Sequence, residues 1–180
     1  TTLTIQADYL HDKRLADQGV PSYHGRPVDV PVETYYGAAN AGARAFVQSD
    51  VKSATATLDH VFTPDLKLHT VLRAYDYALD RNYTSIGGIK DGLDPTVTIG
   101  QSHRLRDEDG RYLQNELSQT LAWGATDHKL LYGLELGHQN KREVLRSRNN
   151  VATYSLFHPV LADLPVLPDT VTPGADNRNR

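Results

Sequence analysis

Residues 53–79, SATATLDHVFTPDLKLHTVLRAYDYAL, consist of two alternating runs that are joined by little more than the residues TPD. In both runs small or apolar residues alternate with polar ones. A period of two is typical of β-strands with one apolar and one polar face. The short break between the runs predicts a tight hairpin turn. The stretch therefore predicts two antiparallel strands, and it leaves open whether their apolar face covers a protein core or lipid.

Three further segments alternate with the same period, so the sequence predicts an all-β, antiparallel fold of about five strands. The expected strands are residues 2–11, 51–62, 65–79, 112–123 and 128–139. Each would carry Leu, Ile, Ala or aromatic residues on one face, and Thr, Ser, Gln or charged residues on the other. Helical spacing fits none of these segments as well.

The predicted connections alternate between short and long. Tight turns are expected after Phe62 and after Trp123, and long loops over residues 12–50, 80–111 and from 140 to the end. Structureless loops of this length are uncommon in compact domains. Outer-membrane barrels, in contrast, have short periplasmic turns at one end and long extracellular loops at the other. The pattern therefore predicts a fragment of an up-and-down transmembrane β-barrel with long extracellular loops and short periplasmic turns.

The positions of two aromatic residues favour a lipid-facing apolar surface. Phe62 and Trp123 each stand on the apolar face at the last position before a tight turn, where outer-membrane barrels carry an aromatic girdle. The alternative is a soluble antiparallel β protein whose apolar face is a core. His60, on the apolar face near Phe62, is more typical of that alternative.

The composition of the chain narrows its possible functions. The 180 residues carry a net charge of −3, which argues against a nucleic-acid partner. They contain no Cys and no Met, and they begin with a strand-like segment, so we expect a piece from inside a longer protein. The chain has no run of 18 or more apolar residues, so the sequence predicts no transmembrane helix. The His residues lack metal-site spacing, and RDEDG (106–110) lacks the spacing of a calcium loop. We therefore expect no catalytic site, no metal site, no cofactor and no enzyme activity.

Several phrases together resemble the barrel of TonB-dependent siderophore receptors. They are ADYLHDKRLADQGVPSYHGRPVDVPVETYYG (7–37), SATATLDHVFTPDLKLHTVLRAYDY (53–77), SHRLRDEDGRYLQNELSQTLAWG (102–124), HKLLYGLELGHQNK (128–141) and VATYSLFHPV (151–160). The resemblance covers about residues 3–160. It implies a 22-stranded barrel around an N-terminal plug, importing a ferric siderophore across the bacterial outer membrane. Residues 1–180 would then be a partial barrel domain, with the plug and the remaining strands absent.

The resemblance also implies the partners of the protein. They would be a ferric siderophore, the TonB energy-transducing complex acting through the missing plug, and outer-membrane lipid with lipopolysaccharide. Two other functions stay open: an outer-membrane porin or a receptor for another cargo, and a soluble antiparallel β domain for binding or adhesion. The sequence does not identify the siderophore.

A ligand site is expected on the polar face near the extracellular mouth. The third predicted strand runs towards the extracellular side and the fourth runs back. The polar-face residues at the extracellular end of each strand should therefore lie at similar height. These residues are Arg73, Tyr75, Tyr77, Tyr112 and Gln114. A guanidinium and several tyrosine rings suit a bulky, anionic iron chelate. The same side chains could instead satisfy each other or the plug.

Residues of the expected loops are further candidates. Tyr35 and Tyr36 could meet the ligand or pack within the first loop. Basic residues of the loops could contact lipopolysaccharide phosphates or attract an anionic chelate; these are Lys13, Arg14, Arg104, Arg106, Lys141 and Arg142.

Overall fold

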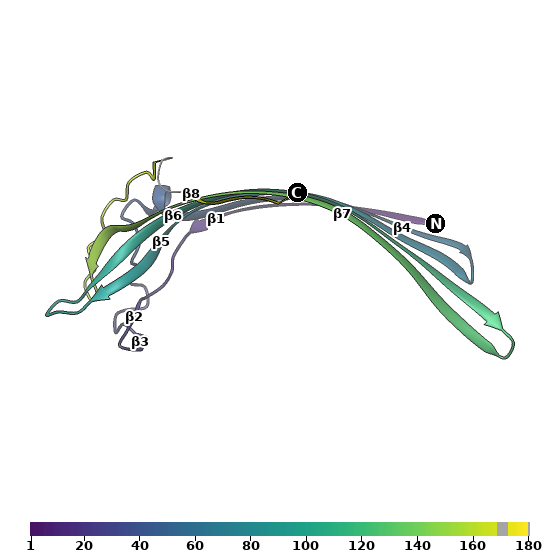
Figure 1. The fold of residues 1–180 in the computed structure, drawn as a ribbon, viewed down its shortest axis with the longest axis horizontal. Coiled ribbons are helices and arrows are strands. Elements are labelled where there is room, and N and C mark those ends of the chain that lie inside the picture. The colour runs from purple at the N-terminus through teal and green to yellow at the C-terminus, as the bar shows by residue number, and fades with distance from the viewer. Residues whose placement is uncertain (169–172, 180) are drawn as a thin grey trace.

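The computed structural model describes residues 1–168 and 173–179, which form one curved antiparallel sheet with a small folded region at one end (Figure 1). Six strands pair in the order β1-β4-β5-β6-β7-β8, and β2 pairs with β3 separately. The elements are β1 (Thr2–Leu15), β2 (Ser22–Tyr23), β3 (Arg26–Pro27), α1 (Ala41–Arg44), β4 (Phe46–Thr63), β5 (Leu66–Lys90), β6 (Thr96–Trp123), β7 (Thr126–Ser155) and β8 (Pro173–Asn179).

The predicted all-β, antiparallel fold is confirmed. Apart from Asp65, which lies in the turn, each of the five predicted strands lies within one of the long strands β1, β4, β5, β6 and β7. These strands follow one another up and down across the sheet. The sheet is open, with β1 at one edge and β8 at the other. Strand β8, which the sequence did not predict, pairs with residues 141–146 of β7. Among the described residues, no helix is long and apolar enough to cross a membrane.

Both predicted tight turns are present, and they lie at the same end of the sheet (Figure 1). Thr63 pairs with Leu66, and Trp123 pairs with Thr126, so each turn has two central residues. Gly124, the first central residue of the second turn, has φ +64°. The favoured two-residue hairpin turns have a positive φ at this position, which glycine adopts without steric cost. The first turn, with Pro64 and Asp65 at its centre, has no positive φ.

The expected loop over residues 80–111 is wrong. Strands β5 and β6 stay paired almost to their far ends, and only residues 91–95 connect them. Strand β7 likewise continues to Ser155, where a loop was expected from residue 140. The pattern missed these extensions because charged residues occupy both faces there and bulges interrupt the period between Ile86 and Ile89 and between Ile99 and Gln101. Backbone pairing does not need an apolar face.

The register brings the apolar residues of five strands into shared rows. One row runs Ile5, Ala56, Leu72, Leu113, Leu136 from β1 to β7. We call the surface around this row the apolar belt; it consists of Leu3, Ile5, Ala7, Ala54, Ala56, Leu58, Leu68, Leu72, Ala74, Leu113, Leu117, Leu121, Leu130, Tyr132, Leu134 and Leu136.

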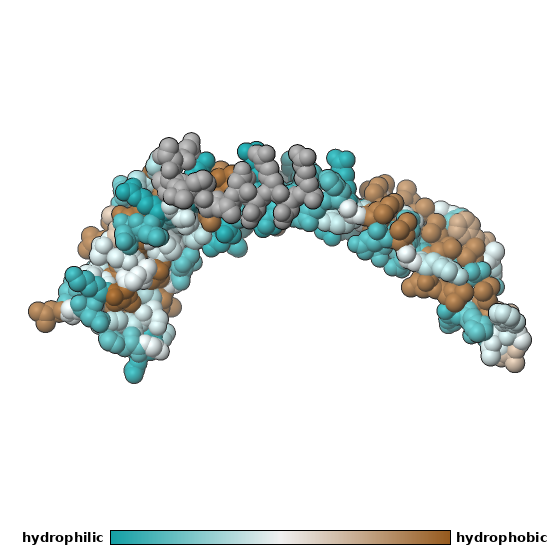
Figure 2. Space-filling view, in the orientation of Figure 1, coloured by the Kyte–Doolittle hydropathy of each residue, from teal (hydrophilic) through white to brown (hydrophobic). Residues whose placement is uncertain are grey.

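The apolar belt is largely uncovered. The exposed fraction is 72% for Ile5 and 56% for Leu134, and it reaches 82% for Trp123 beside the turn. Figure 2 shows hydrophobic residues gathered on the arm that leads to the two turns, while the middle of the arch is mainly hydrophilic. The side chains of the sheet therefore change from apolar to charged along the strands.

The buried core lies at the opposite end from the turns. It consists of Val28, Tyr36, Val97, Ile99, Tyr154 and Leu156, where residues 16–45 fold over the ends of β6 and β7. The Tyr36 hydroxyl donates a 2.5 Å hydrogen bond to the carbonyl oxygen of Leu156, and the Tyr154 hydroxyl donates one of 2.8 Å to that of Gly37. We call residues 16–45 and 156–167 the cap. The expected first loop is therefore a folded unit.

Candidate functional site

Four of the predicted ligand residues line one open groove on the polar face. Arg73 and Tyr112 are direct partners across β5 and β6, and Val71 and Gln114 form the next polar-face pair towards the turns. The groove has a volume of about 440 Å³ and is lined by Val71, Arg73, Tyr75, Tyr112, Gln114 and Glu135. We call it the tyrosine groove. The structure thus brings Arg73, Tyr75, Tyr112 and Gln114 together in one groove.

Two glycines give the tyrosine rings their positions. Tyr75 pairs with Gly110, and Tyr112 pairs with Gly137. A Cβ atom on Gly110 would lie 2.4 Å from Cε1 of Tyr75, and one on Gly137 would lie 2.8 Å from Cδ1 of Tyr112. Real Cβ atoms do not approach this closely, so each ring lies flat over a backbone that only glycine leaves free. The rings stack with centroids 6.3 Å apart and planes 6° apart.

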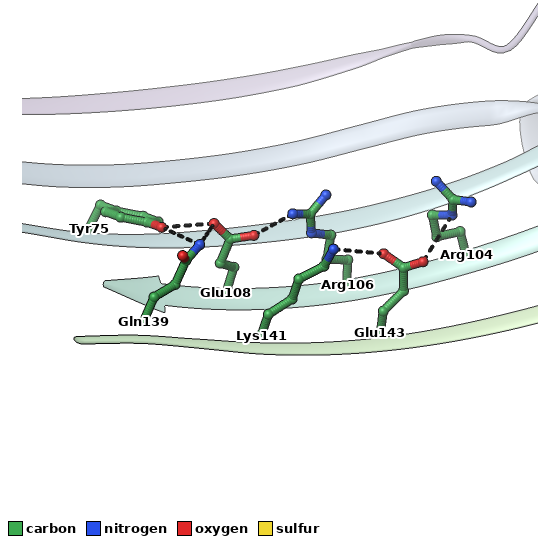
Figure 3. A network of polar contacts seen from close by, with 7 residues as sticks. All are labelled: Tyr75, Arg104, Arg106, Glu108, Gln139, Lys141 and Glu143. Atoms are coloured by element: carbon green, nitrogen blue, oxygen red, sulfur yellow. Dashed lines mark hydrogen bonds and ion pairs between the residues drawn. The ribbon is translucent and has the colours of Figure 1, made fainter. Parts of the chain in front are cut away.

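A hydrogen-bond network fixes the hydroxyl of Tyr75 (Figure 3). This hydroxyl donates to Oε1 of Glu108 at 2.8 Å, and the side-chain amide of Gln139 donates to the same oxygen at 2.6 Å. The guanidinium of Arg106 bonds the other carboxylate oxygen at 2.5 Å. Tyr75 is therefore held by polar contacts at its tip and by Gly110 below its ring.

The network continues along the polar face as alternating charges from β6 and β7 (Figure 3). Glu143 lies 3.7 Å from Nζ of Lys141 and 3.6 Å from Nε of Arg104. We call Arg104, Arg106, Glu108, Lys141 and Glu143 the charged ladder. Side chains two residues apart on one strand share a face, and so do side chains that pair across neighbouring strands. Opposite charges from β6 and β7 therefore meet in rows.

Tyr77 lies against the charged ladder and does not line the tyrosine groove. It pairs with Glu108, and its ring centroid lies 5.8 Å from the guanidinium carbon of Arg106. Its predicted place beside Tyr75 on the polar face is correct, but its ring contacts a protein cation.

Tyr35 and Tyr36 lie in the cap, away from the tyrosine groove. Tyr36 is only 2% exposed, and its hydroxyl is bonded to the Leu156 carbonyl, so burial raises its pKa above the ordinary tyrosine value. Tyr35 is half-buried and lies against Gly37, where a Cβ atom would be 1.9 Å from its Cζ. Of the two alternatives for Tyr36, ligand contact or packing, the structure supports packing.

The basic residues expected in loops lie in strands, and alternation divides them between the two faces. Arg104, Arg106 and Lys141 are on the polar face with the charged ladder. Lys13 pairs with Gln48, and Arg142 pairs with Asp107. Lys13 and Arg142 therefore lie on the same face as the apolar belt, but farther from the turns. The first three side chains therefore lie on the face of the tyrosine groove, and Lys13 and Arg142 lie on the opposite face.

Sequence reasoning missed Glu108, Glu135, Gln139 and the glycines Gly110 and Gly137. Part of the signal was available, because counting back from the two-residue turn at Gly124 places Gly137 opposite Tyr112 and Gln139 opposite Gly110. Residue Glu108 was assigned to a loop, so its place beside Tyr75 was not considered.

No group of three or more His, Asp or Glu side chains among the described residues is arranged to hold a metal ion. Comparison of the sequence with protein-family models finds no match, and comparison with curated proteins finds none either.

Proposed function

We propose that this chain forms part of the wall of a TonB-dependent receptor that imports a ferric siderophore across the bacterial outer membrane. The observation that carries the proposal is the exposed apolar belt on one face of a long antiparallel sheet whose other face is polar. A closed transmembrane barrel needs this division, with apolar residues towards lipid and polar residues towards the lumen.

The energetics of the belt support a lipid environment. Transfer of one Leu or Ile side chain out of water is favourable by about 1.5–3 kcal/mol of free energy. The belt exposes many such side chains. A soluble two-layer protein would cover this face with a second layer of structure. Within residues 1–168 the folded cap packs at the other end of the sheet and leaves Leu134 and Leu136 exposed.

The height of the belt agrees with a bilayer. From Leu113 to Trp123, β6 contributes 11 residues, and a strand of 9–11 residues tilted by roughly 45° crosses the hydrocarbon layer. The exposed Trp123 and Phe62 then lie at one interface, as in an aromatic girdle.

The polar face supplies the means for binding. In the proposed receptor the tyrosine groove and the charged ladder face the lumen, where a plug and this wall together enclose the ferric chelate. The guanidinium of Arg73 binds anionic oxygens, and the two stacked rings give flat contact area. Transport needs no covalent step on the wall.

The proposal is tested with the full-length gene product that carries this segment, in cells starved of iron. Uptake of radiolabelled ferric siderophores is measured with and without a functional TonB. We expect uptake that depends on both the receptor gene and TonB. Uptake that persists without TonB would identify a passive porin, and a full-length protein that stays monodisperse in water without detergent would contradict the lipid-facing belt.

A further inference from the structure

We infer that the tyrosine groove selects a ligand that carries a planar, hydroxylated aromatic ring with a negative charge. This inference rests on the proposed function, because it names the chemical class of chelate that the polar face binds. Two observations carry it: the stacked rings with the glycines beneath them, and the unpaired cation and anion at the two sides of the groove.

The first observation is the flat surface made by Tyr75 and Tyr112. Their planes differ by only 6°, and the ring of Tyr75 is fixed by Glu108 and Gln139 at its hydroxyl. Gly110 and Gly137 leave no Cβ atoms that would tilt the rings. Two parallel rings, one of them fixed at its hydroxyl, offer a preformed surface for a third aromatic ring. Such stacking loses little side-chain entropy on binding.

The second observation is the charge at the two sides of the groove. Among the described residues, Arg73 and Glu135 have no hydrogen-bond or ion-pair partner, and both line the groove. Arg73 is on β5 and Glu135 is on β7, two strand spacings apart and two residues out of register, so their Cα atoms are about 12 Å apart. Strand β6, which carries Tyr112, lies between them, so an aromatic ring stacked on Tyr112 has the cation on one side and the anion on the other.

The opposite charges of Arg73 and Glu135 define which substituents the aromatic ring of the ligand must carry. The Arg73 guanidinium donates paired hydrogen bonds to a carboxylate or phenolate, whereas the Glu135 carboxylate accepts a hydrogen bond from a hydroxyl or amide N–H. A ligand with anionic groups on all sides would meet Glu135 as a like charge. The groove therefore favours a hydroxyaryl chelate over an aliphatic polycarboxylate.

Binding of small probes to the purified full-length protein in detergent tests this inference without measuring transport. The probe is 2,3-dihydroxybenzoate, and the matched control is cyclohexanecarboxylate, which has the same charge and a ring that is not aromatic. We expect saturation-transfer NMR to show contact for the aromatic ring protons, and titration calorimetry to show tighter binding of the aromatic probe. Equal binding of the two probes, or no binding of either, would overturn the inference.

Variants localise the effect to the groove. Tyr112→Leu should weaken binding of the aromatic probe about five- to tenfold, and Arg73→Gln should weaken it about tenfold or more. Glu135→Gln should raise the affinity for citrate more than the affinity for the aromatic probe. Tyr132→Leu, a change on the opposite face, should leave binding unchanged. Equal loss for Tyr132→Leu and Tyr112→Leu would contradict the assignment.

The inference and the proposed function fail in different ways. TonB-dependent uptake of an aliphatic chelate, together with no selectivity for the aromatic probe, would overturn the inference and leave the proposed function standing. Selective binding of the aromatic probe without any TonB-dependent uptake would overturn the proposed function and leave the ligand selectivity of the groove standing.

Discussion

The ring of Tyr75 on β5 lies parallel to the ring of Tyr112 on β6, with their centroids 6.3 Å apart. This arrangement depends on the backbone below each ring, because Tyr75 pairs with Gly110 and Tyr112 pairs with Gly137. A side chain at either glycine would occupy the space of the ring. The candidate binding surface is therefore made by two tyrosines and two glycines acting together.

Gly110→Ala should disturb both rings. The added Cβ atom would lie 2.4 Å from Cε1 of Tyr75 and 3.0 Å from Cε2 of Tyr112, so at least one ring has to move. Overpacking of this kind costs about 1–3 kcal/mol in the free energy of unfolding. Urea unfolding of the full-length protein in detergent measures the loss, and near-ultraviolet circular dichroism reports the changed ring environment.

The matched control for that change is Gly133→Ala. Gly133 is on the same polar face, but a Cβ atom there has no neighbour within 4 Å. Replacing a strand glycine at an open position should leave stability unchanged or raise it slightly. A similar loss at Gly133 and Gly110 would show that the strand backbone, and not the rings, requires glycine.

Glu108→Gln should cost more stability than Glu143→Gln. Glu108 accepts hydrogen bonds from Tyr75 and Gln139 and pairs with Arg106 at 2.5 Å, whereas the ion pairs of Glu143 are 3.6 and 3.7 Å long. Hydrogen bonds to charged groups contribute about 1.5–3 kcal/mol when they are short. The same unfolding assay compares the two variants. If Glu143→Gln were the more damaging change, the network around Tyr75 would not be the stable part of the polar face.

Leu134→Arg should destabilise the protein in a bilayer by roughly 2–4 kcal/mol, because it places a charge on the lipid-facing side. Glu135→Arg, one residue later on the opposite face, should be tolerated much better. Unfolding of the full-length protein from lipid vesicles measures both. Equal tolerance of arginine at the two positions would contradict the assignment of the apolar belt to lipid.

Tyr36→Phe should loosen the cap by about 1–3 kcal/mol. The substitution removes the 2.5 Å hydrogen bond to the Leu156 carbonyl and leaves that buried acceptor without its donor. Hydrogen exchange of the cap amides measures the effect directly. Protection that is unchanged in the cap would show that packing alone holds residues 16–45 in place.

The same tyrosine predicts a dependence on high pH. Burial raises the pKa of Tyr36 in the folded state above its unfolded value of about 10. The neutral hydroxyl therefore stabilises the cap fully below about pH 10, and this contribution is lost as the pH rises through the folded-state pKa. In Tyr36→Phe this contribution is absent at every pH. The difference in cap protection between the two proteins should thus shrink in alkaline solution, and a difference that stays constant would contradict the assignment.

Much of the sheet could be predicted from the sequence. Alternation with a period of two located five strands, and the turn signals at Pro64 and Gly124 located both tight hairpins. The outer halves of β5, β6 and β7 could not be predicted in this way. Charged residues stand on both faces between the apolar belt and the core residues Val97, Ile99 and Tyr154, and the bulges near Ile86 and Gly100 shift the period. No continuous periodic signal therefore remains, although the backbone pairing continues.

The tyrosine groove was predicted in part for a similar reason. Parity placed Arg73 and Tyr75 on one face, and strand direction placed Tyr112 and Gln114 near them. The register between β6 and β7 follows from a two-residue turn. The register between β5 and β6 does not, because residues 91–95 and a bulge separate their paired ends.

The sequence by itself determined which residues share a face, because side chains alternate along every strand and a short turn fixes the partner strand. It determined that an apolar surface and a polar surface lie back to back. Only the tertiary structure decided that Tyr75 stands over Gly110, that Glu108 reaches its hydroxyl, and that Tyr36 is buried with Leu156. Each of these contacts joins residues at least 33 positions apart. Their meeting depends on the relative register of long strands and on the folding of the cap, which no local pattern encodes.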